Sequence, residues 1–314
     1  MHMVNIPNHL IIHSIVSQNS LSIFYDRSFL DPNASGIGYP VSPGATDPKV
    51  PPVIGVEKPS HPHHVPQKHK PAENGIESLS APTDHAETYS ELRERQLRHG
   101  FIRKVYGILI LQLLLTFAIV AVFVFVNPVK VFVQANYFML YIALAIILVV
   151  LIALVCFPKV ARTSPGNYIA LTIFTLAEGY FIGVFASYYN AVVVLLAVGG
   201  VIVLTLALTL FAFQTRWDFT YLSGGLLAFL IILIIFGIFA AIFQNAILSI
   251  VYASIGMLVF SAFLIYDTQM IIGGKHRTIS YKTDEYVFAA LSLYLDIINL
   301  FMFLLSLIGL GGGR

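Results

Sequence analysis

Seven long apolar runs occupy the chain beyond residue 104 and limit what this 314-residue sequence can fold into. Each run has about 20 residues, the length that a helix needs to cross the hydrocarbon layer of a membrane. Because helices satisfy their backbone polar groups internally, the runs predict membrane-spanning helices joined by short loops. The predicted spans are Val105–Val126, Tyr137–Phe157, Asn167–Ser187, Ala191–Phe213, Leu222–Phe243, Ala246–Ile272 and Tyr286–Leu310. The expected fold class is an all-α membrane protein, a bundle of seven transmembrane helices.

Composition separates this membrane part from the first 90 residues. Hydrophobic residues make up 57% of the chain and charged residues 11%, whereas soluble domains carry about 25% charged residues. The segment 1–90 holds 12 of the 15 prolines and lacks a sustained apolar period, which is typical of a disordered tail. We therefore expect a disordered Pro-rich tail over 1–90 and a seven-helix membrane domain over 91–314. The net charge of +2 gives no information about nucleic acid, and we expect no nucleic-acid partner.

Basic residues are divided unevenly between the two sides of the predicted bundle. One side carries eleven of them, and the other has only Lys130 and Arg314. The eleven are Arg93, Arg95, Arg98, Arg103, Lys104, Lys159, Arg162, Arg216, Lys275, Arg277 and Lys282. Because Lys and Arg accumulate in cytoplasmic loops, the N-terminal tail is predicted to be cytoplasmic.

Three carboxylic acids lie inside otherwise uncharged spans: Glu178, Asp267 and Asp296. No Lys or Arg occurs in the same three spans. An ionised side chain at bilayer depth costs about 2.5–3.5 kcal/mol on insertion scales, so such acids usually line an ion-conducting path or share protons. The alternative is that each acid is a neutral, hydrogen-bonded packing group.

Asp267 and Asp296 are expected to lie in the same half of the membrane. Asp267 is near the end of the sixth span, and Asp296 is about ten residues into the seventh. Two adjacent carboxyl groups cannot both ionise readily, so they tend to share one proton. However, Asp267 lies about 100° from the stripe of small residues on its own helix. This offset argues against a common orientation of the two acids.

A polar stripe surrounds Asp296 on the seventh span. Ser292, Asp296 and Asn299 follow spacings of four and three residues and share one helix face. Small and polar residues on membrane helices usually face protein rather than lipid. Ser292 and Asn299 are therefore predicted to line an ion pathway together with Glu178 of the third span.

The residues around these acids resemble the C-terminal signature of a known family. Tyr266-Asp-Thr-Gln269, Asp284-Glu-Tyr286 and Ser292-Leu-Tyr-Leu-Asp-Ile-Ile-Asn-Leu-Phe301 are similar to motifs of the Bax inhibitor family, also called transmembrane Bax inhibitor motif or lifeguard proteins. Phe211-Ala-Phe-Gln-Thr-Arg-Trp-Asp-Phe-Thr220 resembles the lifeguard branch that includes the glutamate-receptor-associated protein. The resemblance covers residues 91 to about 310.

This resemblance implies a pH-sensitive calcium leak with a cytoprotective, anti-apoptotic role, in the endoplasmic reticulum or Golgi rather than the plasma membrane. By the family pattern, Asp267 and Asp296 are the paired aspartates that sense pH. Glu178 matches an acid in the third span of eukaryotic members. In prokaryotic relatives an arginine after the second span latches onto the pair, and Arg162 is the candidate for that latch here. No cofactor is expected: calcium is the permeant ion, held only transiently at Asp267 and Asp296.

The leading functional hypothesis is therefore a calcium leak gated by the aspartate pair, since Ca²⁺ prefers oxygen ligands. Apoptosis-regulating membrane proteins are the expected partners. The alternative is a non-conducting adaptor that regulates apoptotic or receptor proteins through its bundle and tail. An aspartyl intramembrane protease also uses two aspartates, but the chain lacks the Gly-x-Gly-Asp and Pro-Ala-Leu motifs of those enzymes. No enzymatic activity is expected.

Overall fold

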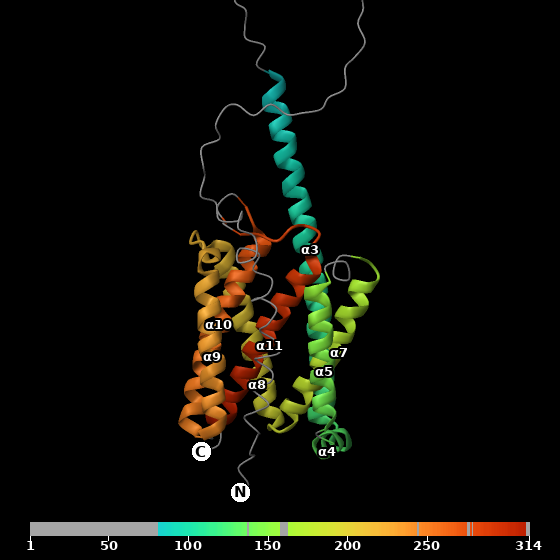
Figure 1. Ribbon diagram of the computed structural model, residues 1–314, viewed down its shortest axis with the longest axis vertical. Coiled ribbons are helices and arrows are strands. Elements are labelled where there is room, and N and C mark those ends of the chain that lie inside the picture. The colour runs from blue at the N-terminus through green and yellow to red at the C-terminus, as the bar shows by residue number, and fades with distance from the viewer. Residues whose placement is uncertain are drawn as a thin grey trace, which may run out of the picture. The chain divides into compact units, whose positions relative to one another are not determined.

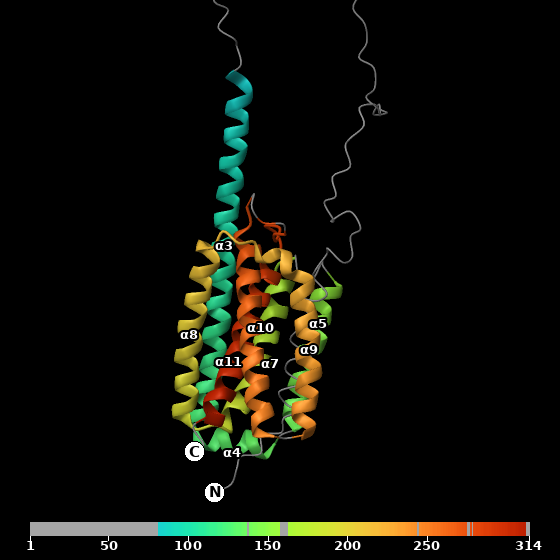
Figure 2. The same ribbon diagram turned by 90° about the vertical axis from the view of Figure 1, so that its left-hand side faces the viewer.

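The computed structural model describes residues 81–136, 138–157, 163–243, 245–274, 277 and 279–311. The regular structure of this part is helical throughout, and the helices run side by side in a bundle (Figures 1 and 2). The helices are α3 (Ala81–Phe125), α4 (Asn127–Ala135), α5 (Phe138–Cys156), α7 (Gly166–Ser187), α8 (Ala191–Gln214), the 3-10 helix η1 (Phe219–Leu222), α9 (Ser223–Phe243), α10 (Ala246–Ile272) and α11 (Tyr286–Gly311). The predicted all-α fold is confirmed.

Six of these helices are long and apolar enough to cross a membrane. They are α3, α7, α8, α9 with η1, α10 and α11. The remaining predicted span corresponds to α5, which with α4 forms a pair bent by 82° that counts as a seventh span if taken together. The chain is therefore a multi-pass membrane protein.

Helix α3 begins earlier than the predicted end of the tail. It starts at Ala81, so residues 81–90 are helical although the sequence analysis assigned them to the disordered tail. Pro82 lies in the first turn, where proline is tolerated because its missing N–H has no intrahelical acceptor. The rest of the predicted tail, residues 1–80, lies outside the described residues. The bundle discussed below begins at Arg93.

The short helix α4 was not predicted and lies across one end of the bundle (Figure 2). A proline in its first turn favours helix initiation. Its Val133 is buried, whereas the neighbouring Val131 and Phe132 are exposed. Gln134 Nε2 donates a hydrogen bond of 2.9 Å to the carbonyl of Ser187, which ties α4 to the end of α7. The segment between α3 and α5 is therefore a short amphipathic helix.

Helix α11 forms the centre of the bundle. Every residue from Val287 to Phe303 is buried, and α10, α8 and α7 all pack against this helix. By contrast, α8 exposes Leu196, Val203 and Leu210 along one face, as expected of a helix that faces lipid. The polar residues of α11 are consequently enclosed by protein.

Candidate functional site

Asp267 and Asp296 meet where α10 packs against α11. Their carboxyl groups are close enough to interact with one another, and the two residues are 2% and 5% exposed. The interpretation of the 100° offset as evidence against a common orientation is wrong. Every residue from Phe263 to Ile271 is buried, so this end of α10 is surrounded by protein, and a side chain at any angle meets another helix.

The contact between the two acids has a chemical consequence. Two carboxylates carry only acceptor atoms, so a hydrogen bond between them requires that a proton lie between the oxygens. Within the described ranges, neither aspartate forms an ion pair with a basic residue, and Asp296 Oδ2 has no hydrogen-bond partner. The pair is thus a buried site at which two carboxyl groups can share one proton, and Asp296 Oδ2 is an additional oxygen atom there.

The arginines described near this end of the bundle make other contacts. Arg98 donates to the carbonyls of Tyr281 and Ile271, and Arg277 donates to carbonyls of the segment before η1. Arg162, the latch candidate from the sequence, lies outside the described residues.

The two other predicted pathway residues of α11 have different surroundings. Ser292 Oγ lies 3.1 Å from the hydroxyl oxygen of Tyr281. Asn299 donates through Nδ2 to the carbonyl of Leu295, 2.8 Å away on its own helix. Both are buried. Ser292 therefore connects the stripe to the segment that precedes α11, whereas the amide of Asn299 is directed to its own backbone.

Glu178 belongs to a second group of buried polar side chains, which we call the α3–α7–α11 cluster. Its members are Gln112, Thr116, Thr175, Glu178 and Tyr294. Gln112 Nε2 donates to Thr175 Oγ1 at 3.1 Å, and the hydroxyl groups of Thr116 and Tyr294 are 2.8 Å apart. Glu178 lies within electrostatic range of Tyr294. Because Tyr294 is two residues before Asp296, α11 contributes to both groups.

Three members of this cluster were missed by the sequence analysis: Gln112, Thr116 and Tyr294. Single polar residues in long apolar spans are common and carry little information by themselves. One signal was available, since Gln112 and Thr116 are four residues apart and therefore share one face of α3. That spacing does not reveal which helix the face meets.

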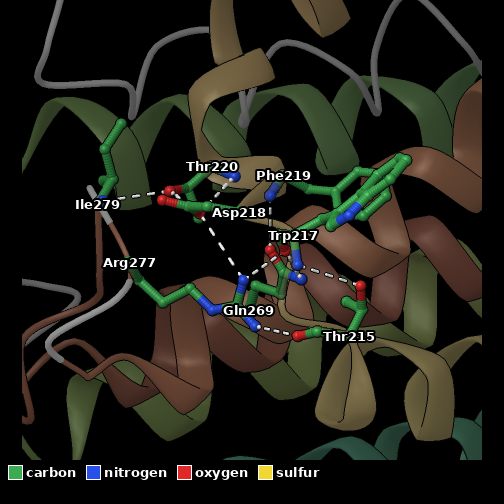
Figure 3. A network of polar contacts seen from close by, with 8 residues as sticks. All are labelled: Thr215, Trp217, Asp218, Phe219, Thr220, Gln269, Arg277 and Ile279. Atoms are coloured by element: carbon green, nitrogen blue, oxygen red, sulfur yellow. Dashed lines mark hydrogen bonds and ion pairs between the residues drawn. The ribbon is translucent and has the colours of Figure 1, made fainter.

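A third polar network joins the segment between α8 and α9 to the end of α10 and to the segment that follows α10 (Figure 3). Gln269, two residues after Asp267, accepts from Phe219 N at 2.8 Å and donates to the Trp217 carbonyl at 3.0 Å. Arg277 donates to the carbonyls of Trp217 and Thr215 at 2.6 and 3.1 Å. These contacts fix the segment between α8 and α9 against the end of α10.

Asp218 makes further contacts within the segment between α8 and α9. Its Oδ1 accepts hydrogen bonds from the backbone N–H and the hydroxyl group of Thr220 at 3.0 and 2.6 Å. Arg277 Nη1 lies 3.9 Å from the same oxygen, and Ile279 N–H donates to Thr220 Oγ1 at 3.4 Å (Figure 3). All of these residues lie at or beyond the ends of spans, so the network connects loops rather than lining the bundle interior.

Comparison with known proteins identifies the family of this chain. The family described as "Inhibitor of apoptosis-promoting Bax1" matches residues 98–313. The chain belongs to the Bax inhibitor family. This match includes both aspartates, Glu178 and the loop network, and it confirms the family resemblance noted from the sequence.

Individual relatives of this family align over most of the chain. Protein lifeguard 3 of Homo sapiens is 37% identical over 277 residues, which cover 87% of this chain and 88% of the human protein. Protein lifeguard 3 of Mus musculus is 37% identical over the same shares. Protein LIFEGUARD 3 of Arabidopsis thaliana is 37% identical over 217 residues, or 68% of this chain and 85% of the plant protein. The similarity thus extends between animal and plant members.

Proposed function

We propose that this protein is a slow, pH-sensitive calcium leak of an intracellular membrane with a cytoprotective, anti-apoptotic role. The observation that carries the proposal is the carboxyl pair of Asp267 and Asp296, buried between two spans and free of ion pairs within the described residues. Acids at that depth are typical of sites that pass cations or protons. The proposal involves no covalent chemistry and no cofactor.

The number of oxygen ligands supports transient rather than tight calcium binding. Ca²⁺ takes six to eight oxygen ligands in its stable sites. Within the described residues, no group of three or more acidic, His or Cys side chains is arranged to hold a metal ion. Two carboxyl groups supply at most four oxygen ligands, so they attract the ion without trapping it, which conduction requires.

The shared proton supplies the pH sensitivity. Loss of this proton leaves two adjacent like charges, which repel one another and weaken the contact between α10 and α11. Two tyrosines lie beside residues close to the pair in sequence: Tyr106 of α3 beside Thr268, and Tyr281 beside Ser292. Glu285, the residue before α11, accepts a hydrogen bond from Lys282 N.

The family supports the cellular part of the proposal. Its description names inhibition of an apoptosis-promoting protein, and its resemblance implies the endoplasmic reticulum or Golgi. We place the end of the bundle that bears Arg98 and Arg277 in the cytoplasm, because basic residues accumulate there. Apoptosis-regulating membrane proteins are the proposed partners.

The test is calcium flux into dye-loaded proteoliposomes between pH 5 and 8, for the wild type and for Asp296→Asn. The variant keeps the size of the side chain but leaves a single carboxyl group that has no second acid with which to share a proton. We expect the flux of the wild type to change with pH and that of the variant to be constant. Asp284→Asn, which removes an exposed acid before α11, serves as the matched control and should keep the wild-type profile.

Two results would count against the proposal. An unchanged pH response in Asp296→Asn would remove the pair from gating. No flux above that of empty vesicles at any pH would favour the non-conducting adaptor and reduce the acids to structural hydrogen bonding.

A further inference from the structure

An aromatic side chain lies between the aspartate pair and the end of the bundle at which α11 begins. Tyr281 belongs to the segment 279–285 and is only 3% exposed. Its hydroxyl oxygen lies 3.1 Å from Ser292 Oγ. Ser292 precedes Asp296 by four residues, about 6 Å along α11, and shares its face. The hydroxyl group of Tyr281 therefore contacts α11 about one helical turn from Asp296, on the side of that end.

The backbone of Tyr281 is held as well as its ring. Its N–H donates to the carbonyl of Met270 at 3.1 Å. Its own carbonyl accepts from Arg98 Nη1 at 2.8 Å, and the same nitrogen lies 3.5 Å from the carbonyl of Ile271. The carbonyls of Met270 and Ile271 are in the last turn of α10, where helix carbonyls lack intrahelical partners. Arg98 thus connects the segment before α11 with the end of α10.

The position of Arg98 is itself restricted. Its guanidinium carbon lies 5.5 Å from the centre of the Phe101 ring, a cation–π distance. Gly273 has a φ of 59°, and a Cβ atom added there would lie 2.7 Å from Arg98 Nη2. Residue 273 therefore needs to be glycine both for its left-handed backbone and for the close approach of Arg98.

We propose that Tyr281 is the stopper of the path that contains the aspartate pair, and that Arg98 is the positioning residue that holds this stopper in place. This inference rests on the proposed leak and names the element that keeps its resting flux low. Opening the path then requires displacement of the Tyr281 ring in addition to a change in the protonation of the pair.

The test measures access to the site directly and does not depend on conduction. Cys156 is replaced by Ser, which removes the chain's single cysteine, and Ser292→Cys is introduced as the reporter. The full-length protein in proteoliposomes is treated with a charged methanethiosulfonate reagent. With Tyr281 present, the thiol is expected to react slowly. Adding Tyr281→Ala should raise the rate about tenfold or more, because a thiol enclosed by protein reacts only through local opening.

Further variants separate the stopper from general loosening of the fold. Tyr281→Phe keeps the ring and should keep the thiol protected. Arg98→Gln removes the hydrogen bond to the Tyr281 carbonyl, and Gly273→Ala displaces the Arg98 guanidinium group that donates it. Both variants should accelerate labelling although the Tyr281 ring is present. Arg103→Gln replaces an exposed arginine on the same helix and should leave the rate unchanged. If Tyr281→Ala does not fold, the Arg98 and Gly273 variants carry the test.

The stopper is overturned if the reporter reacts equally fast with Tyr281 and with alanine at position 281, or if Arg98→Gln and Arg103→Gln behave alike. Calcium flux in the same proteoliposomes, without the reporter, separates the two proposals. Faster labelling of Tyr281→Ala without any calcium flux would support the stopper and reject the leak. Flux in the wild type with no effect of either substitution would support the leak and reject the stopper.

Discussion

Buried hydroxyl groups distinguish the α3–α7–α11 cluster from ordinary membrane packing. The hydrogen bond between Thr116 and Tyr294 is enclosed, since both residues are 0% exposed. The ring of Tyr294 also meets Phe174 edge to face, with centroids 6.3 Å apart. The side chain therefore contributes both an apolar body and one polar contact to the centre of the bundle.

Replacing Tyr294 by Phe tests the polar contact alone. The ring remains, but the Thr116 hydroxyl loses its partner and has only its own helix backbone to bind. We expect thermal unfolding in detergent to show a loss of about 0.5–1 kcal/mol, the usual range for hydrogen bonds within membrane proteins. Tyr221→Phe is the control, because Tyr221 is 76% exposed. Equal stability of the two variants would show that the contact contributes nothing.

At the level of residues, the sequence identified the acids but not their surroundings. The rarity of charge in apolar spans makes Glu178, Asp267 and Asp296 recognisable. The partners of these acids come from other helices, and neither the rotation of a helix nor its neighbours follow from the spacing of its own residues. For this reason the offset of Asp267 was misinterpreted, and Tyr294 was not recognised as a neighbour of Glu178.

At the level of helices, α10 and α11 approach each other closely through a glycine. A Cβ atom added to Gly256 would overlap the ring of Phe303. Small residues at such positions let membrane helices approach closely. The same contact surface contains the aspartate pair about three turns further along α10, so this glycine helps to determine how firmly the two acids are pressed together.

Gly256→Ala is expected to destabilise the protein by about 1–3 kcal/mol through overpacking against Phe303. Gly199→Ala is the matched control, because nothing lies within 4 Å of the added carbon and alanine is the better helix former. Heating in detergent followed by size-exclusion chromatography measures both. Adding Phe303→Leu should restore part of the loss in the first variant. Equal melting of the two alanine variants would contradict the close packing.

At the level of the whole molecule, the number of crossings determines the sides of the membrane on which the ends of the bundle lie. With α4 and α5 counted as one bent crossing, the start of α3 and the end of α11 lie on opposite sides. We expect protease added to cells with a permeabilised plasma membrane to remove an N-terminal epitope and to spare a C-terminal one. If both epitopes were removed, the α4–α5 pair or α11 would not cross.

Most of the fold followed from the sequence because the membrane imposes a length and a composition on each span. The bounds of α10 coincide with the prediction, and those of α7, α8, α9 and α11 differ from it by one residue at most. The exceptions are the short α4 and the start of α3. Neither is constrained by the thickness of the bilayer, since α4 is only nine residues long and the first turns of α3 are not apolar.

The central place of α11 has a consequence for biosynthesis. The ribosome makes this helix after all the helices that surround it, so α7, α8 and α10 enter the membrane before the surface on which they pack exists. Until α11 arrives, Glu178 and Asp267 lack the helix that encloses them. We therefore expect a chain that stops before residue 286 to be less stable in the membrane than the full chain, because these two acids would lack their contacts with α11.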